Sequence, residues 1–343
     1  MSVPVVAFFN NKGGVGKTSL VYHLAWMFAD LGVRVVAADL DPQANLTAAF
    51  FDDDELEDLW KSGDSIYGLI EPLIKGVGDV RKGLTGSEGL LLLSGDLRLS
   101  TFEDELSLQW PQCLAGNERA FRVESAFWRV MQWSADSAAA DLILVDLGPN
   151  LGSINRAALI AADFVVIPLS PDLYSLQGLR NLGPTLRRWR RDWADRLNRR
   201  PEMDLELPAG RIEPLGYVVL QHGVRLDRPV KAYEKWINRI PKEYRDSILS
   251  ESGGENYTIQ NDPHRLALLK HYRSLMPMAQ EARKPMFHLK PADGAIGAHF
   301  KSAQEAYADF KTLALAIAKG ARLPVVTSQI SSFGAGVSPP NPS

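Results

Sequence analysis

Residues 12 to 18 read Lys12-Gly-Gly-Val-Gly-Lys-Thr18, a glycine-rich loop that ends in a lysine and a hydroxyl residue. The run before it, Val5 to Phe9, is apolar and of strand length. From Thr18 to Leu31, apolar side chains recur at helical spacing. A glycine-rich turn between a buried strand and a helix is the setting of a phosphate-binding loop. The sequence therefore predicts that phosphates bind at this turn; a glycine turn without a ligand is the alternative.

Each part of this loop has a use in binding a phosphate chain. Glycines let the backbone aim successive N–H groups at an anion, and the helix N-terminus adds its positive end. Lys17 offers a fixed charge for the β- and γ-phosphates, and Thr18 offers a hydroxyl ligand for Mg²⁺. We therefore expect the phosphate chain of a nucleotide and Mg²⁺ as ligands. The residues expected to bind the nucleotide are Lys12, Gly13, Gly14, Val15, Gly16, Lys17, Thr18 and Ser19.

An early lysine distinguishes this loop from the general pattern, because Asn11 stands where a glycine is usual and Lys12 follows it. In this the loop resembles the deviant Walker A motif of the ParA/MinD ATPases. Three further segments are similar to motifs of that family, in the same order. They are Val33 to Thr47, which contains Asp39-Leu-Asp41-Pro-Gln; the Walker B-like run Asp141 to Asn150; and Val165 to Gly178.

The resemblance implies a role for each charged residue near the nucleotide. Lys12 reaches the nucleotide of a partner subunit and neutralises the charge that develops during hydrolysis. Asp41 positions the attacking water, Asp39 supports the water shell of the metal, and Asp146 holds a metal-bound water. Lys12, Lys17 and Asp41 are thus the expected catalytic residues, and Thr18, Asp39 and Asp146 the expected metal site. The alternatives are an exposed loop lysine at position 12 and, for the aspartates at 39 and 41, a helix cap and a surface turn.

Two further positions bear on the nucleotide site. Members of the family usually continue Asp-x-Pro-Pro after Walker B, whereas Gly148 stands at the first proline position here. Because this loop senses the γ-phosphate, we expect a looser switch with metal binding retained. Gln221 follows the apolar run Gly216 to Leu220, where the family often has an asparagine near the base. It is expected either to contact the nucleotide or to have a structural role.

The composition excludes some related classes of protein. Apolar residues make up 45% of the 343 residues and charged residues 23%, as in ordinary globular proteins. The single cysteine, Cys113, allows no internal disulfide and no pair of ligands for the iron–sulfur cluster of nitrogenase iron proteins, which share the early lysine. No secretory signal and no apolar run of membrane-spanning length is present, so we expect a cytoplasmic, nucleoid-associated protein.

Alternating strand and helix signals predict an α/β fold, a doubly wound and mostly parallel sheet flanked by helices, in one domain with a C-terminal helical elaboration. We expect the ATPase domain to span residues 1–325, with a less typical helical region at about 225–295 and a disordered tail at 326–343. The expected strands are 3–9, 34–39, 90–93, 142–146, 164–168 and 216–220. Later helices are expected at 230–239, 263–275 and 298–319.

An arginine run is the best candidate for a partner surface. Between residues 180 and 200 there are eight arginines and two aspartates, although the net charge of the chain is −3. Leu186, Trp189, Trp193 and Leu197 form an apolar stripe at helical spacing, which leaves most arginines solvated. Such clusters suit the phosphates of DNA. The expected DNA-binding residues are Arg187, Arg188, Arg190 and Arg191; the alternatives are a solvated helix face, or a DNA site around Lys270, Arg273, Arg283 and Lys284.

These features favour a ParA-like ATPase. The resemblance implies an ATP-dependent sandwich homodimer that binds DNA non-specifically and segregates DNA or positions a cargo, with hydrolysis stimulated by a ParB-like or cargo adaptor. A MinD-like regulator that cycles on a membrane is one alternative, but it needs a basic amphipathic C-terminal helix, and the Ser/Gly/Pro-rich end of the chain offers none. We therefore expect no membrane anchor. A nucleotide-dependent interaction module without turnover is the other alternative.

Overall fold

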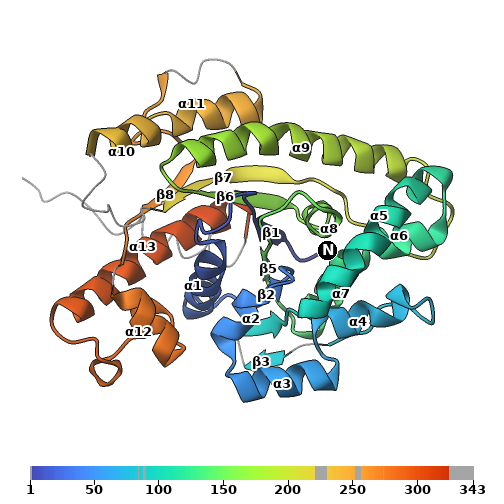
Figure 1. Cartoon of the computed structure of the whole chain (residues 1–343), viewed down its shortest axis with the longest axis horizontal. Coiled ribbons are helices and arrows are strands. Elements are labelled where there is room, and N and C mark those ends of the chain that lie inside the picture. The colour runs from blue at the N-terminus through green and yellow to red at the C-terminus, as the bar shows by residue number, and fades with distance from the viewer. Residues whose placement is uncertain are drawn as a thin grey trace, which may run out of the picture.

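A computed structural model describes residues 2–83, 85–87, 90–220, 230–251, 256–272 and 274–323. Its central feature is an eight-stranded sheet in the order β3-β4-β2-β5-β1-β6-β7-β8 (Figure 1). Seven strands run parallel, and β3 pairs antiparallel with β4. The strands are β1 Val5–Phe8, β2 Val35–Asp39, β3 Thr85–Ser87, β4 Leu90–Leu93, β5 Leu142–Asp146, β6 Phe164–Leu169, β7 Glu213–Leu220 and β8 Arg265–Leu269. The predicted doubly wound α/β fold is confirmed.

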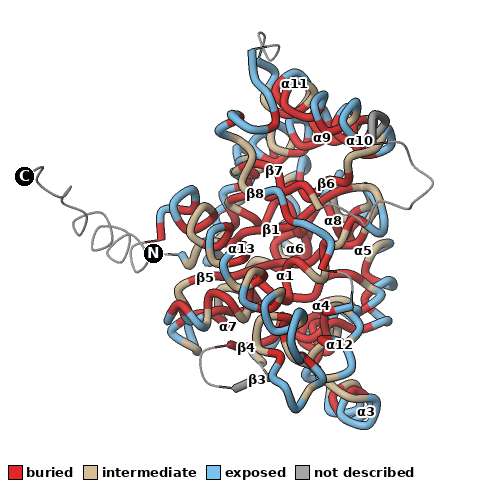
Figure 2. Tube along the Cα trace, turned by 90° about the vertical axis from the view of Figure 1, so that its left-hand side faces the viewer, coloured by how far each residue is buried: buried red, intermediate tan, exposed pale blue. Residues whose placement is uncertain are grey.

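Helices cover both faces of this sheet and bury a core on each (Figure 2). On one face lie α1 Lys17–Asp30, α2 Asn45–Phe50, α12 Leu275–Ala282 and α13 Ala298–Gly320. The other face carries α4 Ile66–Ile74, α5 Phe102–Gln112, α6 Glu118–Glu124, α7 Ala126–Ser137, α8 Ser153–Ile160, α9 Leu173–Leu197 and α11 Ile240–Tyr244. The remaining α-helices are α3 Asp53–Ser62 and α10 Val230–Ile237.

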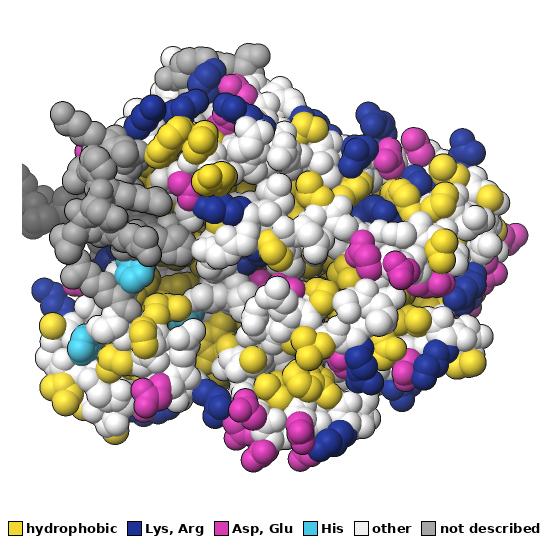
Figure 3. Space-filling view, viewed as in Figure 1, with side chains coloured by type: hydrophobic (Ala, Val, Ile, Leu, Met, Phe, Trp, Pro, Cys, Tyr) yellow, Lys and Arg dark blue, Asp and Glu magenta, His cyan; other side chains and the backbone are white. Residues whose placement is uncertain are grey.

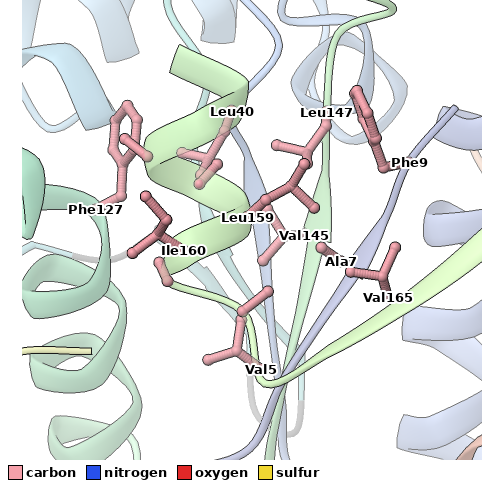
Figure 4. Packing of buried hydrophobic residues seen from close by; sticks show 14 of the residues in the cluster. Val5, Ala7, Phe9, Leu40, Phe127, Val145, Leu147, Leu159, Ile160 and Val165 are labelled. Carbon is pink, nitrogen blue, oxygen red and sulfur yellow. The ribbon is translucent and has the colours of Figure 1, made fainter. Parts of the chain in front are cut away.

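Strand β1 shows why the sequence reads as a continuous apolar run. Val5 and Ala7 point into the core that also contains Phe127 of α7 and Leu159 and Ile160 of α8 (Figure 4). Val6 and Phe8 point into the opposite core with α1 and α13. Successive side chains of a strand face opposite sides, so a strand covered on both faces must be apolar at every position.

The same register brings the predicted site residues to one edge. The glycine loop follows β1, Asp39 ends β2 and Asp146 ends β5. Asp39 pairs with Asp146 across β2 and β5, and Phe8 pairs with Asp146 across β1 and β5. All three strands end at the carboxyl edge of the sheet, where open α/β folds bind their ligands.

One predicted element is wrong. Residues 263–275 were expected to form a helix, but Arg265–Leu269 is strand β8, and α12 begins only at Leu275. The run is short and apolar, so its periodicity does not separate helix from strand. Residues 265–269 form a strand because the edge of β7 offers their backbone parallel hydrogen-bond partners. The helix predicted at 230–239 is confirmed as α10 and that at 298–319 as α13. The predicted tail at 326–343 lies outside the described residues.

Candidate nucleotide site

The glycine loop has the backbone of a phosphate-binding loop. Gly14 and Gly16 have φ angles of 70° and 82°, in the left-handed region where a side chain is strained. Gly16 is also the N-cap of α1, and no side chain caps that end of the helix. The first N–H groups of α1 are therefore directed at the mouth of the loop, as anion binding requires.

Lys17, the first residue of α1, folds back over this loop. Its side chain is buried, and its Nζ lies 3.5 Å from the carbonyl oxygen of Lys12. Burial lowers the pKa of Lys17, while the nearby carboxylates of Asp146 and Asp41 act in the opposite direction. The lysine is thus held among acidic groups at the position where a phosphate chain would need its charge.

Asp146 is the least satisfied acidic group of the site. It is completely buried, and neither carboxylate oxygen has a hydrogen-bond partner among the described residues. Burial raises its pKa and Asp39 raises it further, whereas the Thr18 hydroxyl and Lys17 oppose the rise. Buried polar atoms are nearly always paired. Two unpaired carboxylate oxygens beside a threonine hydroxyl fit the oxygen donors that a hydrated Mg²⁺ prefers.

Asp39, by contrast, is occupied with neighbouring backbone. Its Oδ2 accepts hydrogen bonds from the backbone N–H and the hydroxyl of Thr47, at 2.8 and 2.7 Å. The Thr47 hydroxyl oxygen accepts a further bond from Gly95 N at 2.7 Å. Burial raises the pKa of Asp39. This network connects the start of α2 to the end of β4, so Asp39 stabilises the structure in the way expected of a helix-capping aspartate. Its role in the water shell of the metal stays a prediction.

Asp41 lies between the two loops of the site. Its Oδ1 accepts a hydrogen bond from Gln43 N at 3.0 Å, which closes a turn after β2. A Cβ atom at Gly148 would lie 3.2 Å from the same oxygen. The loop after β5 therefore approaches Asp41 closely, and a side chain at position 148 would press on it. The expected looseness of the Gly148 switch stays a prediction.

Lys12 lies against its own chain. Its ammonium group forms an ion pair with Asp172, and its backbone N–H donates to Asn10 Oδ1 at 3.0 Å. Asp172 is the N-cap of α9, where its Oδ1 accepts from Ser175 N at 2.9 Å. About a quarter of each paired side chain is exposed, 27% for Lys12 and 22% for Asp172. Any reach toward a partner subunit must first break this pair.

A pocket of about 700 Å³ opens beside the loop, on the face that is hollowed between α12 and α2 (Figure 3). Its walls include Gly13, Lys17, Thr18, Asp41 and Pro149, so it joins the phosphate loop to the carboxylates. The sequence did not predict Pro149 or Gln43, nor the lining residues from α2, α12 and the second turn of α1. Those residues are Tyr22, His23, Asn45, Ala48, Ala49, Met276, Ala279 and Gln280. Tyr22 and His23 follow the glycine loop by about one helical turn, so the sequence could have indicated them. Helix α12 contains no motif that would indicate a contact with the nucleotide. Gln221 lies outside the described residues.

The arginine run divides into two groups on α9. Arg187 donates to the carbonyl oxygens of Ser247 and Ile248, at 2.7 and 3.1 Å. Arg190 is half-buried and donates to the carbonyl oxygen of Ile212. Arg188 and Arg191 are exposed. The apolar stripe is confirmed, because Leu186, Trp189 and Trp193 are buried and Leu197 is partly buried.

Basic side chains beyond the predicted four extend this surface. Lys235 on α10, Arg239 at the N-cap of α11 and Lys242 on α11 are exposed. Lys242 pairs with Asp246 at 3.1 Å, and α11 contacts α9. Figure 3 shows lysine and arginine side chains gathered over α10, α11 and α9. The alternative site is partly neutralised: Lys270 pairs with Glu305, and Lys284 pairs with Asp293. Arg273 lies outside the described residues.

The glycine loop between β1 and α1, with acidic residues at the ends of β2 and β5, defines a P-loop protein of the ParA/MinD type. Residues 3–199, more than half of the chain, match the family described as an AAA domain (AAA_31), and the chain belongs to this family. It is 32% identical to the sporulation initiation inhibitor protein Soj of Bacillus subtilis over 184 residues. That match covers 53% of this chain and 64% of Soj.

Two solved structures share the fold. A protein from Corynebacterium diphtheriae has a TM-score of 0.65 at 24% identity, over 93% of this chain and 98% of its own. McdA from Cyanothece, in a complex with ATP, has a TM-score of 0.57 at 13% identity, over 94% of this chain and 97% of its own. At these identities the likeness concerns the fold alone. Within the described ranges, no helix combines the length and apolar character that a membrane crossing requires.

Proposed function

We propose that the chain binds and hydrolyses ATP with Mg²⁺. The observation that carries this is the buried, unpaired carboxylate of Asp146 beside Thr18 and Lys17, at the mouth of an uncapped helix. Lys17 and the loop N–H groups bind the β- and γ-phosphates, with Val15, Gly16 and Ser19 completing the loop. Thr18 and Asp146 would hold the metal. Mg²⁺ neutralises negative charge on the phosphates. The ATP complex of McdA, which has the same fold, supports this choice of nucleotide.

Asp41 orients the attacking water in this proposal. It lines the pocket next to the glycine loop, and its carboxylate is fixed on one side by the Gln43 N–H. A positioned carboxylate that still has acceptor capacity can hold a water in line with the γ-phosphate. Asp39 supports Asp41 indirectly, because its hydrogen bonds to Thr47 fix the end of β2.

Hydrolysis proceeds in an ATP-dependent homodimer. Lys12 leaves Asp172 and reaches the phosphates of the second copy, where a cation stabilises developing charge as an arginine finger does. The positive charge of Lys12 stabilises the transition state in the other subunit, so hydrolysis depends on formation of the dimer. ATP binding then joins two subunits and hydrolysis releases them, and we expect the rate to be low until a partner protein stimulates it.

The DNA surface in this proposal is centred on Arg188 and Arg191. Arg187 and Arg190 also belong to the predicted set, but their bonds to backbone carbonyls support a role in fixing α9 to its neighbours. Lys235 on α10 and Arg239 at the N-cap of α11 extend the basic surface. Contacts to phosphates carry no sequence information, so binding is non-specific and salt-dependent. The likeness to the chromosome-partitioning ATPase Soj of Thermus thermophilus and the chromosome partitioning protein ParA of Myxococcus xanthus supports a role in segregating DNA or positioning a cargo on the nucleoid. A ParB-like or cargo adaptor is the partner in this proposal.

Calorimetry with Mg-ATP tests the nucleotide assignment. Wild type should bind, and Lys17→Ala should not, because the phosphates lose their fixed cation. Lys61→Ala is the matched control, since Lys61 is an exposed lysine whose partner is Glu57 on α3. Unchanged affinity in Lys17→Ala, or no binding in wild type, would refute the proposal.

A further inference from the structure

A glutamate outside the motifs closes the helix that follows the Walker B strand. Glu103 lies in the first turn of α5, and its two carboxylate oxygens accept hydrogen bonds from Ser153 N and Ile154 N, the latter at 2.9 Å. These are the first two residues of α8, whose own N-cap, Gly152, has no side chain with which to cap. A carboxylate at a helix N-terminus satisfies free N–H groups and complements the helix dipole. Glu103 thus acts as the missing cap from another helix.

Gly152 is adapted to this contact. A Cβ atom at this position would lie only 2.6 Å from Glu103 Oε1, so any other residue would push the carboxylate off the helix end. A second bond lies alongside, between the hydroxyls of Ser107 on α5 and Ser153 on α8, at 2.7 Å. The start of α8 is therefore held at a fixed place on α5.

The loop between Asp146 and α8 depends on that helix for its shape. Asn155 of α8 donates through Nδ2 to the carbonyl oxygens of Gly148 and Asn150, at 2.9 and 2.7 Å. At its other side this loop meets the nucleotide residues. Gly148 adjoins Asp41, and Pro149 lies against Gly13, with 3.8 Å between its Cγ and the Cβ position of that glycine. A shift of α8 would consequently be felt at Asp41.

Helix α5 is fixed to the same site at its other end. The short helix η1, Leu97–Thr101, leads directly from the end of β4 into α5. Just before it, Gly95 N donates to the Thr47 hydroxyl that holds Asp39. These contacts connect Asp39 to α5, α5 to α8, and α8 to the loop beside Asp41. Among the described residues, Glu103 is the only charged side chain that forms a hydrogen bond with the N-terminus of α8.

We propose that Glu103 is a positioning residue for ATP hydrolysis, which holds α8 and the 147–152 loop so that Asp41 and the γ-phosphate meet in a reactive geometry. This inference rests on the proposed ATPase function. Among the described residues, the hydrogen bonds of Glu103 go to α8, and none joins it to the glycine loop or to Lys17. We therefore expect it to act on the chemical step and to leave nucleotide binding to the loop.

Steady-state ATP hydrolysis tests this with three variants of the full chain. In Glu103→Ala, kcat should fall about tenfold with KM for ATP changed less than about twofold, the pattern of a lost interaction that serves the transition state. Glu103→Gln keeps the length and one acceptor oxygen, so its kcat should lie between those of Glu103→Ala and wild type. Glu105→Ala is the matched control: it removes a half-buried glutamate of the same helix, which pairs with Arg119 at 2.7 Å and does not bond α8.

The outcomes separate three explanations. A kcat that is unchanged in Glu103→Ala, or that falls equally in Glu105→Ala at matched thermal stability, would overturn the positioning role. If Glu103→Ala does not fold, Ser107→Ala replaces it, because loss of its bond to Ser153 should lower kcat in the same direction by a smaller factor; no change there would also overturn the proposal. No hydrolysis by wild type would refute the proposed function instead.

Discussion

The ion pair between Lys12 and Asp172 predicts that the free subunit restrains its own dimerisation. Replacing Asp172 by serine removes the carboxylate that pairs with Lys12 but keeps a hydroxyl that can cap α9, since serine and aspartate are comparable N-caps. The fold should therefore be retained while the lysine is released. Asp172→Ser should form ATP dimers more readily than wild type.

The solvent exposure of the Lys12–Asp172 pair determines how much free energy the ion pair contributes. With about a quarter of each side chain exposed, 27% and 22%, the pair belongs in the upper part of the range for surface ion pairs, about 0.5–1 kcal/mol. A dimer breaks two such pairs, so the variant should gain about 1–2 kcal/mol, or about 5- to 30-fold in the dimer dissociation constant.

Sedimentation velocity with ATP, over a range of protein concentrations, measures that constant. Asp172→Ala is the control: it frees Lys12 equally but loses the cap, so it should show the same gain in dimerisation with about 1 kcal/mol lower stability. If both variants dimerise like wild type, the ion pair is no restraint, and the reasoning from Lys12 is wrong.

Three further outcomes are expected. Burial raises the pKa of Glu124 from 4.5 to about 8, against the opposing charge of Arg156. Between these two values the folded state holds a proton that the unfolded chain releases, so the free energy of unfolding should fall by about 1.4 kcal/mol for each unit of rising pH. Thermal melts at pH 5.5 and 7.5 measure this dependence, which Glu124→Gln should lose. Replacing Arg188 and Arg191 by alanine should weaken binding to unrelated duplexes alike and flatten the salt dependence measured by fluorescence anisotropy with ATP, whereas an unchanged slope would make the run a solvated helix face. Arg187→Ala should instead lower the melting temperature, because its guanidinium binds two carbonyl oxygens of the neighbouring segment; a loss of DNA affinity at unchanged stability would contradict this.

The sequence was sufficient for the parts of the site that local patterns specify. The glycine loop and the strand ends at Asp39 and Asp146 are contiguous motifs, and parallel strands bring their carboxyl ends to one edge. The edge strand β8 was missed because a short apolar run has no decisive period, and its partner strand lies about 45 residues earlier.

Contacts between distant segments could not be read from patterns. Nothing near Glu103 indicates that it caps a helix 50 residues later, and the pairing of Lys12 with Asp172 joins residues 160 apart. The same holds for the arginines of α9. Their charge is visible in the sequence, but only the packing of the 240–249 segment against α9 separates Arg187 from Arg188.

The central claim is that Lys12 serves the active site of the partner subunit, and mixing two inactive variants tests it most directly. Lys12→Ala should lack the cation supplied to the partner, and Asp41→Ala should lack its own water-positioning carboxylate, so each alone should hydrolyse ATP poorly. A mixed dimer contains one site with an intact Asp41 and an intact Lys12 from the other subunit. ATP turnover of an equal mixture should recover to about a quarter of the wild-type rate if the subunits associate at random, since half of the dimers are mixed and each has one active site. A mixture no more active than its two components would contradict the account.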